Sequence, residues 1–227
     1  YNGLLQRQSI TQKTLNTQTQ LTYNKTIAEK HNVDALVGFE TEDYNYMYNY
    51  LMGNDYPGTL YEIGNAGTKD ADSGQSDYRL TSILGRLNYN YDNKYYLGLS
   101  YRTDGSSRLS RDNRWGSFWS VSGSWRFMSE SFTKPISSVL TDGKVRVSYG
   151  VNGTQPGSYY GYMNLYRYGQ NYNGSSGMGV IGVGNPDLKW EKNKALNIGL
   201  DLTFWNRLSI TFDYYNRKSS DLLMDKA

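Results

Sequence analysis

Six tyrosines gather in one stretch of the chain that is otherwise rich in glycine and asparagine. A phenol ring has an apolar face and a polar tip, so it can stack on a sugar or pack against a partner protein. The same rings could instead pack within their own loop or on neighbouring loops. The side chains that we take as candidate substrate or partner contacts are Tyr159, Tyr160, Tyr162, Tyr166, Tyr168 and Tyr172.

A second set of polar side chains alternates with apolar residues along the chain. Its members are arginines and one asparagine, which can hydrogen-bond a passing solute. They could equally form a network that holds a protein wall, or a plug inside it, in place. The residues that we predict to line a lumen are Arg86, Asn88, Arg102, Arg126 and Arg146.

Residues that usually carry catalysis or bind metals are scarce. The chain has no Cys and one His, which removes thiolate sites and most histidine-based schemes. His31 lies in a predicted turn without partners at ligand spacing, so we expect a surface residue. Asp70, Asp72 and Asp77 fall in a predicted loop, but Gly74 occupies a ligand position and the EF-hand spacing fails. We therefore expect no catalytic group, cofactor or metal, with a loop calcium near Asp70 and Asp72 as the weaker alternative.

The glycine run from Gly177 to Gly182 fits the pattern G-x-G-x-x-G. A dinucleotide site needs a buried strand before this pattern and a helix after it. The sequence predicts neither, because Asn185 and Pro186 follow at once. A flexible glycine-rich loop is predicted instead.

The segment from Ile83 to Arg102 alternates apolar and polar residues on both sides of a short turn at Asp92 to Lys94. A period of two predicts β-strands, and the short turn predicts a hairpin. One face carries aromatic rings at its ends and aliphatic residues between them, and the other carries Arg and Asn. Such faces are typical of a transmembrane β-barrel, with lipid outside, a polar lumen inside and aromatic residues at both interfaces.

The same alternation predicts eight antiparallel strands in an all-β chain. Their expected ranges are 16–28, 33–46, 83–91, 95–102, 115–127, 144–152, 188–204 and 208–218. Short turns near 30, 93 and 206 alternate with loops over 47–77, 103–114 and 153–187, an asymmetry typical of outer-membrane barrels. The stretch 128–143 is intermediate and can hold a short helix. All four prolines fall outside the predicted strands, as expected for residues without an N–H.

The composition fits this interpretation. Mean hydropathy is −0.72, yet 15% of the residues are aromatic, whereas disordered chains are poor in aromatic residues. No apolar run reaches the roughly 18 to 20 residues of a membrane helix. The net charge of +3 is dispersed and gives no basic stripe for nucleic acid. The chain starts at Tyr1 without a Met and its last residues read as the beginning of a further segment, so we expect a fragment.

Several motifs resemble one protein family. The run from Arg86 to Phe127 resembles the barrel of SusC/RagA-type TonB-dependent outer-membrane transporters, and further stretches agree in the same order. These stretches cover 21–40, 144–155, 185–223 and, more loosely, 56–67. The most specific motifs are Asp-Gly-Ser-Ser-Arg from Asp104, Asn-Pro-Asp-Leu-Lys-Trp-Glu from Asn185, and Asp-Tyr-Tyr from Asp213.

The resemblance implies a barrel of about 22 strands in the outer membrane of a Gram-negative bacterium of the Bacteroidetes type. It implies an N-terminal plug, a SusD-like surface lipoprotein as a lid, and energy from TonB–ExbB–ExbD. The implied function is active import of a bulky nutrient, an oligosaccharide or a peptide. Residues 1–227 would be part of the barrel domain and supply about eight strands. The plug, the TonB box and the closing strands would lie outside them.

Two other functions stay open at this point. Eight strands are enough to close a small barrel, which would act as an outer-membrane anchor or adhesin. Pairing of the first predicted strand with the last would identify such a barrel. An outer-membrane hydrolase would need a Ser, His and Asp set near the rim, and His31 alone, on the side of the short turns, argues against it. We therefore predict that the protein is not an enzyme. The sequence does not identify the solute that it would import.

Overall fold

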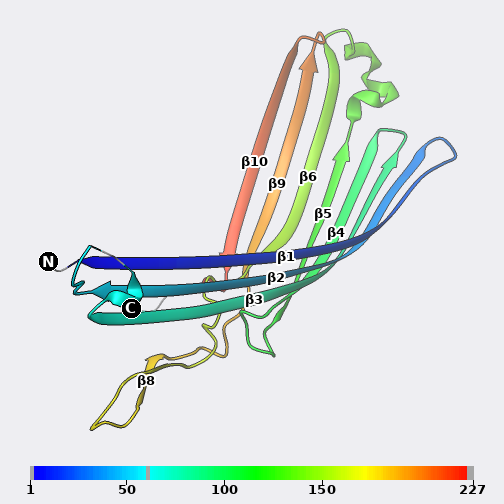
Figure 1. Ribbon diagram of the computed structural model, residues 1–227. Helices are drawn as coiled ribbons and strands as arrows, with labels where there is room; N and C mark the ends of the chain where they lie inside the picture. Colours follow the sequence, from blue (N-terminus) through cyan, green and yellow to red (C-terminus); the bar gives the residue numbers. More distant parts are fainter. Residues whose placement is uncertain (1–2, 60–61, 224–227) are drawn as a thin grey trace. The chain divides into compact units, whose positions relative to one another are not determined.

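The computed structural model describes residues 3–59 and 62–223 as an all-β protein with three short 3-10 helices (Figure 1). Eight strands form one sheet in the order β1-β2-β3-β4-β5-β6-β9-β10, and β7 and β8 form a second, two-stranded sheet. The contacts divide the chain into unit 1, Tyr1–Thr17 with Thr41–Leu80, and unit 2, Gln18–Glu40 with Thr81–Ala227. Among the described residues, no helix has the length and apolar character needed to cross a membrane.

The predicted all-β class and the eight strands of the main sheet are confirmed. The strands are β1 Leu4–Ile27, β2 His31–Asn54, β3 Thr68–Tyr91, β4 Tyr95–Ser106, β5 Trp115–Trp125, β6 Leu140–Thr154, β7 Leu165–Tyr168, β8 Met178–Gly182, β9 Glu191–Phe204 and β10 Leu208–Ser220. The 3-10 helices are η1 Ile63–Asn65, η2 Phe127–Ser129 and η3 Ser131–Ile136. Pro135 lies in η3, and the other three prolines also lie outside strands, as predicted.

The predicted loop over 47–77 is wrong at both ends. β2 runs on to Asn54 and β3 begins at Thr68, so each of these strands has 24 residues. The added residues are mostly polar, and the prediction had followed apolar alternation. Backbone pairing does not require apolar side chains, so polar strands continue as far as they find a neighbour. Asp70, Asp72 and Asp77 therefore lie in β3 and not in a loop.

The strand registers in unit 2 confirm the two faces predicted for the central hairpin. Tyr95 of β4 pairs with Trp125 of β5, and Tyr101 pairs with Trp119, so aromatic pairs stand at both ends of one face. The pair Leu99 and Val121 lies between them, and these side chains are exposed. β4 and β5 have 12 and 11 residues, about the length of a tilted strand that crosses a bilayer. This face is suited to lipid.

The short turns of unit 2 share one backbone geometry. Each has two successive residues with positive φ, as in the type I′ turn that matches the twist of a hairpin. These pairs are Ala28 and Glu29, Asp92 and Asn93, and Trp205 and Asn206. Asn and Asp tolerate this region readily, whereas the Ala, Glu and Trp residues are held there by the strands on either side.

Backbone hydrogen bonds join these connections to one another. Asp92 N donates to Lys30 O at 2.7 Å, Arg126 N to Lys94 O at 2.8 Å, and Trp205 N to Val139 O at 2.9 Å. The helices η2 and η3 lie at the same end of unit 2 as the turn from β9 to β10, and the segment with β8 lies at the other end (Figure 1). The predicted separation of short connections from long ones therefore holds within unit 2.

The buried core of unit 2 lies among its long loops. Leu109 is 0% exposed and Trp190 is 6% exposed. The Trp190 ring packs edge-on against Phe118 with 5.4 Å between centroids, and its Nε1 donates to Arg114 O at 2.8 Å. Ser110 Oγ donates to Pro186 O at 2.8 Å. We call these residues, with the motifs from Asp104 and Asn185, the loop junction.

In unit 1 a smaller buried group closes the connection from β2 to β3. Tyr56 and Ala66 are its buried residues. Gly53 leaves room for both, because a Cβ at this position would lie 2.8 Å from the Ala66 Cβ and would also meet the Tyr56 hydroxyl. Gly67 N donates to Asp55 O at 3.1 Å. These contacts fix the ends of two long strands.

Glu130, between η2 and η3, accepts a hydrogen bond from the Tyr95 hydroxyl at 2.6 Å. This bond, helped by Trp125 Nε1 and Lys94, lowers the pKa of the Glu130 carboxyl against the opposing effect of burial. A carboxyl with a lowered pKa stabilises the fold above its ordinary value of 4.5, and this contribution is lost as the pH falls through the folded pKa. Below about pH 4.5, the stability of Glu130→Gln should depend less on pH than that of the native protein.

The measurement is denaturant unfolding of the full-length protein in detergent between pH 3 and 6. Glu29→Gln is the matched control, because it removes one carboxylate from an exposed turn. The control should keep the native pH dependence. Identical pH curves for Glu130→Gln and the native protein would contradict the role of the Tyr95 hydrogen bond.

Candidate functional site

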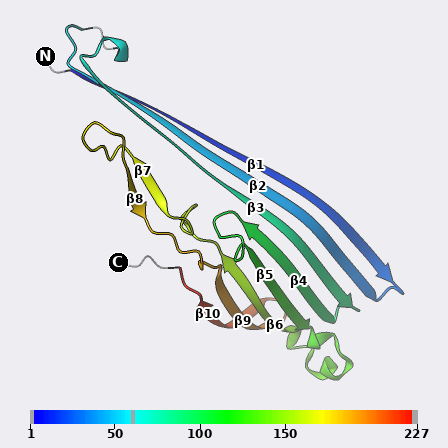
Figure 2. The same cartoon turned by 90° about the horizontal axis from the view of Figure 1, so that it is seen from below.

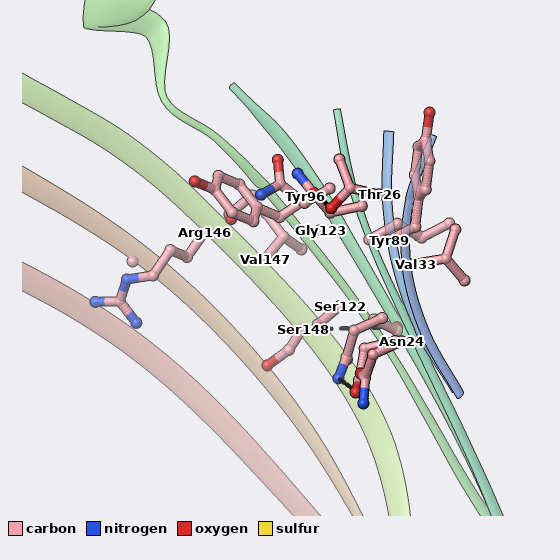
Figure 3. Close-up of a pocket in the computed structure, with 18 of the residues that line it drawn as sticks. Asn24, Thr26, Val33, Tyr89, Tyr96, Ser122, Gly123, Arg146, Val147 and Ser148 are labelled. Carbon is pink, nitrogen blue, oxygen red and sulfur yellow. Dashed lines mark hydrogen bonds between the residues drawn. The ribbon is translucent and has the colours of Figure 1, made fainter. Parts of the chain in front are cut away.

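A cavity of about 580 Å³ lies in unit 2 and is lined by residues of β1 to β6 and β9 (Figure 3). Most of its lining side chains are amides, hydroxyls or charged groups, including Asn24, Ser122 and Ser148. Arg146 and Asn88, two of the five predicted lumen residues, are part of this lining. Such a surface offers donors and acceptors to a hydrated solute, or to a protein segment that fills the space.

Arg146 of β6 is held by carboxylates from the next two strands. Its Nε and Nη2 donate to Asp201 of β9 at 2.7 and 3.0 Å, and Nη2 also donates to Asp213 of β10 at 3.1 Å. The geometry is a bidentate fork with a second acceptor. Gly199 makes room for it, since a Cβ there would lie 2.7 Å from the guanidinium carbon. One guanidinium therefore joins two carboxylates that come from neighbouring strands.

The other predicted lumen residues are also paired across strands. Asn88 Nδ2 donates to Asp34 at 3.1 Å, and Arg86 lies 3.6 Å from the same carboxylate. A fork also joins Arg126 to Asp142, at 2.8 and 3.1 Å.

Arg102 has the largest set of partners. It contacts Glu40 at 2.9 Å and Asp104 at 2.6 Å, and its Nη2 donates to Ser82 Oγ at 2.8 Å. The five residues thus bind polar partners in four separate groups, and contact with a solute stays a prediction. The acidic partners were not singled out from the sequence. The sequence could have indicated these acidic partners, because they lie on the polar side of the same alternation.

The six tyrosines fall into two groups. Tyr159, Tyr160 and Tyr162 are half-buried, and Arg108 lies 4.5 Å from the centre of the Tyr159 ring. Tyr166, Tyr168 and Tyr172 project from the segment that contains β7, and the last two are 80% and 85% exposed. The first group packs near the loop junction, and the second is open to a partner. Their role as contacts stays a prediction.

Sequence reasoning missed the ribbon that β7 and β8 form (Figure 2). The glycine run from Gly177 to Gly182 was predicted as a flexible loop, but Met178–Gly182 is β8 and pairs with β7. Glycine lowers strand propensity, so only the register with Leu165–Tyr168 shows the strand. No helix follows β8 in the part of the chain that the structure describes. The nucleotide-binding pattern therefore lacks its required context.

His31 and the aspartates differ from their predicted settings. His31 begins β2, and its Nδ1 lies 2.7 Å from the Tyr89 hydroxyl, so it is a partly buried packing residue rather than a surface turn residue. Asp72 accepts a hydrogen bond from the Tyr48 hydroxyl at 2.7 Å. Within residues 3–59 and 62–223, no three His, Cys, Asp or Glu groups are close enough to hold a metal. The expectation about calcium near Asp70 and Asp72 stays a prediction.

Comparison with known proteins decides the family. The family model described as TonB dependent receptor-like, beta-barrel, matches residues 1–227. The chain belongs to this family. The resemblance predicted from the sequence motifs is thereby confirmed, and with it the relation to outer-membrane barrels of the SusC type.

Two curated relatives of this TonB-dependent receptor chain illustrate the match. It is 35% identical to the TonB-dependent receptor SusC of Bacteroides thetaiotaomicron over 201 residues, which are 84% of the chain and 20% of SusC. It is 32% identical to the TonB-dependent receptor P39 of Formosa agariphila over 206 residues, which are 88% of the chain and 20% of P39. The chain thus spans about a fifth of the length of these relatives.

Solved structures of a peptide transporter have the same fold. The structure of the RagAB peptide transporter matches with a TM-score of 0.92 at 27% identity, over 99% of this chain and 25% of that one. The RagAB peptide importer in its 'open-open' state matches with a TM-score of 0.85 at 28% identity, over 98% of this chain and 25% of that one.

The family and the sheet order together bear on the alternative of a small closed barrel. β1 and β10 are the outermost strands of the eight-stranded sheet, and no pairing joins them among the described residues. An unpaired edge presents free N–H and C=O groups, which a membrane barrel has to satisfy. This open sheet and the family membership argue against a self-contained eight-stranded anchor.

Proposed function

We propose that the chain forms part of the wall of a TonB-energised outer-membrane importer for a bulky nutrient. The observation that carries this proposal is the open, eight-stranded sheet with a lipid-suited face and an ion-paired polar face. Further strands of a barrel of about 22 would continue from β1 and β10. The plug and the segment that contacts TonB–ExbB–ExbD would lie outside residues 1–227. We propose no catalytic role for the chain.

The polar face supports a solute path because its charges are already paired. Arg146, Arg102 and Arg126 each bind a carboxylate of the wall. Their side chains stay about 40% exposed, so remaining donors can meet a hydrated solute without leaving an unpaired charge. A wall of this kind offers weak contacts, which suit passage better than tight binding.

The β7–β8 ribbon supports a lid of the SusD type. Its exposed side chains include aromatic and aliphatic residues on a short two-stranded hairpin, and a cluster of exposed apolar groups marks a protein contact more often than it marks a free surface. We propose that a SusD-like surface lipoprotein covers this ribbon. The cargo is an oligosaccharide or a peptide, and the structures named as peptide transporters favour the peptide.

The test uses the full-length protein in the bacterium that encodes it. Affinity purification from the outer membrane should recover a SusD-like lipoprotein, and deletion of the protein should abolish growth on one oligosaccharide or peptide source. Deletion of TonB should give the same growth defect. Normal uptake of every nutrient after deletion, or a barrel that purifies without a lipoprotein, would overturn the proposal.

A further inference from the structure

Four tyrosines occupy every second position of β2 in unit 1, at Tyr44, Tyr46, Tyr48 and Tyr50. We call them the tyrosine ladder. Side chains two residues apart in a strand leave the same face about 7 Å from one another. The Tyr46 and Tyr48 rings have centroids 6.4 Å apart, and Tyr44 stacks on Tyr78 of β3 at 5.2 Å. The ladder therefore places four aromatic rings on one face of β2.

Carboxylates of both strands lie against this surface. The Tyr48 hydroxyl donates to Asp72 of β3 at 2.7 Å, and the Tyr78 hydroxyl donates to Glu42 of β2. Asp70 is two residues from Asp72 in the same strand, so it lies on the same face. A carboxylate has about four lone-pair sites, so each retains acceptor capacity after binding a phenol.

A glycine sets the position of the central ring. A Cβ at Gly74 of β3 would collide with the ring of Tyr48, so only glycine lets this ring lie against the strand. The tyrosines of the ladder are half-buried. Rings that are held in this way lose little conformational freedom when a ligand binds, which favours binding.

The basic residues of unit 1 are separated from the ladder, because all of them lie on the other face, whereas carboxylates lie on both faces. In the described residues of this unit, every Lys and Arg stands at an odd-numbered position: Arg7, Lys13, Lys69 and Arg79. Arg7 pairs with Glu62 at 2.9 Å, Arg79 pairs with Asp43, and Lys69 Nζ donates to Gly64 O at 2.9 Å. Within unit 1, the face of the ladder at even-numbered positions has Glu42, Asp70 and Asp72, and the described residues of this face include neither Lys nor Arg.

Aromatic faces and carboxylates both attract cations, the rings through their quadrupole and the carboxylates through charge. An extended peptide also presents alternate side chains about 7 Å apart, the spacing of the ladder. We propose that the tyrosine ladder, with Glu42, Asp70 and Asp72, binds the Lys or Arg side chains of an extended peptide. This inference rests on the proposed import function and names basic peptides as a cargo class. A neutral sugar would use the rings but not the charge separation.

The test measures binding of the hexapeptide Lys-Ser-Lys-Ser-Lys-Ser to the purified full-length transporter by calorimetry. The native protein should bind this peptide and not its Glu-Ser counterpart, and added salt should weaken the binding. The double variant Asp70→Asn and Asp72→Asn should raise the Kd roughly tenfold, because two cation partners lose their charge. Tyr46→Leu with Tyr50→Leu should raise it several-fold, because the rings lose their negative faces.

The matched control is the double variant Asp43→Asn and Asp77→Asn, which makes the same change in net charge at odd-numbered positions of β2 and β3. It should leave the Kd unchanged. Equal weakening by both double variants, no binding of the lysine peptide, or displacement of this peptide by a neutral maltohexaose would overturn the inference. Uptake of the growth nutrient is measured separately in the same strains. Normal uptake with one of these results would overturn the ladder proposal and leave the import function standing.

Discussion

Trp190→Ala is expected to lower the free energy of unfolding by about 3–5 kcal/mol, the range for a large buried aromatic residue. The side chain is 6% exposed and packs on Phe118. Its Nε1 also donates to Arg114 O, 76 residues away in the chain, so the variant leaves a carbonyl without this partner as well as a cavity. Gly116 leaves space for the indole, since a Cβ there would lie 2.9 Å from it. The site has little freedom to collapse.

The measurement is urea unfolding of the full-length barrel in detergent, followed by the loss of its heat-resistant band on gels. Trp115→Ala is the control, because Trp115 is 56% exposed and its removal should cost much less. Both variants change the same residue type, and Trp115 and Trp190 line one pocket. A cost for Trp190→Ala no larger than that for Trp115→Ala would mean that the loop junction does not stabilise the barrel.

Local alternation predicted the strands that face lipid, because the period of two and the aromatic ends are properties of a short segment. It failed where the strands turn polar. β1, β2 and β3 each have 24 residues, and their outer parts are held by pairing with neighbouring strands, which no local pattern records. The β7–β8 ribbon was missed for the same reason, since its glycines suggest a loop until the pairing is known.

The functional residues show a similar limit. The sequence predicted that Arg146 lies on a polar face, but its partners Asp201 and Asp213 are 55 and 67 residues away. Only the strand register shows that they meet. The motifs from Asp104 and Asn185 carried the family resemblance without revealing their role. In the structure Ser110, which follows the first motif, donates a hydrogen bond to Pro186 of the second, and the buried residues of both motifs serve packing. Motif specificity here reflects a structural constraint on the loops.

A variant of the β7–β8 ribbon should fold normally and yet fail to bind the lid. Tyr168, Tyr172 and Val180 are 80%, 85% and 62% exposed, so replacing all three with serine removes few contacts within the chain. Surface changes of this kind usually alter stability by about 0.5 kcal/mol or less each. The triple variant should therefore reach the outer membrane in normal amounts.

The same variant should lose its lid. Exposed aromatic side chains dominate the energy of protein interfaces, and truncation of a central one typically costs about 2 kcal/mol or more. Recovery of the SusD-like lipoprotein in purification should fall at least roughly tenfold, and nutrient uptake should fall with it. The triple variant Gln170→Ser, Asn171→Ser and Ser176→Ala changes exposed polar residues of the same segment and should keep both. If the first variant retains its lipoprotein, the lid binds elsewhere and the ribbon's apolar surface serves another contact.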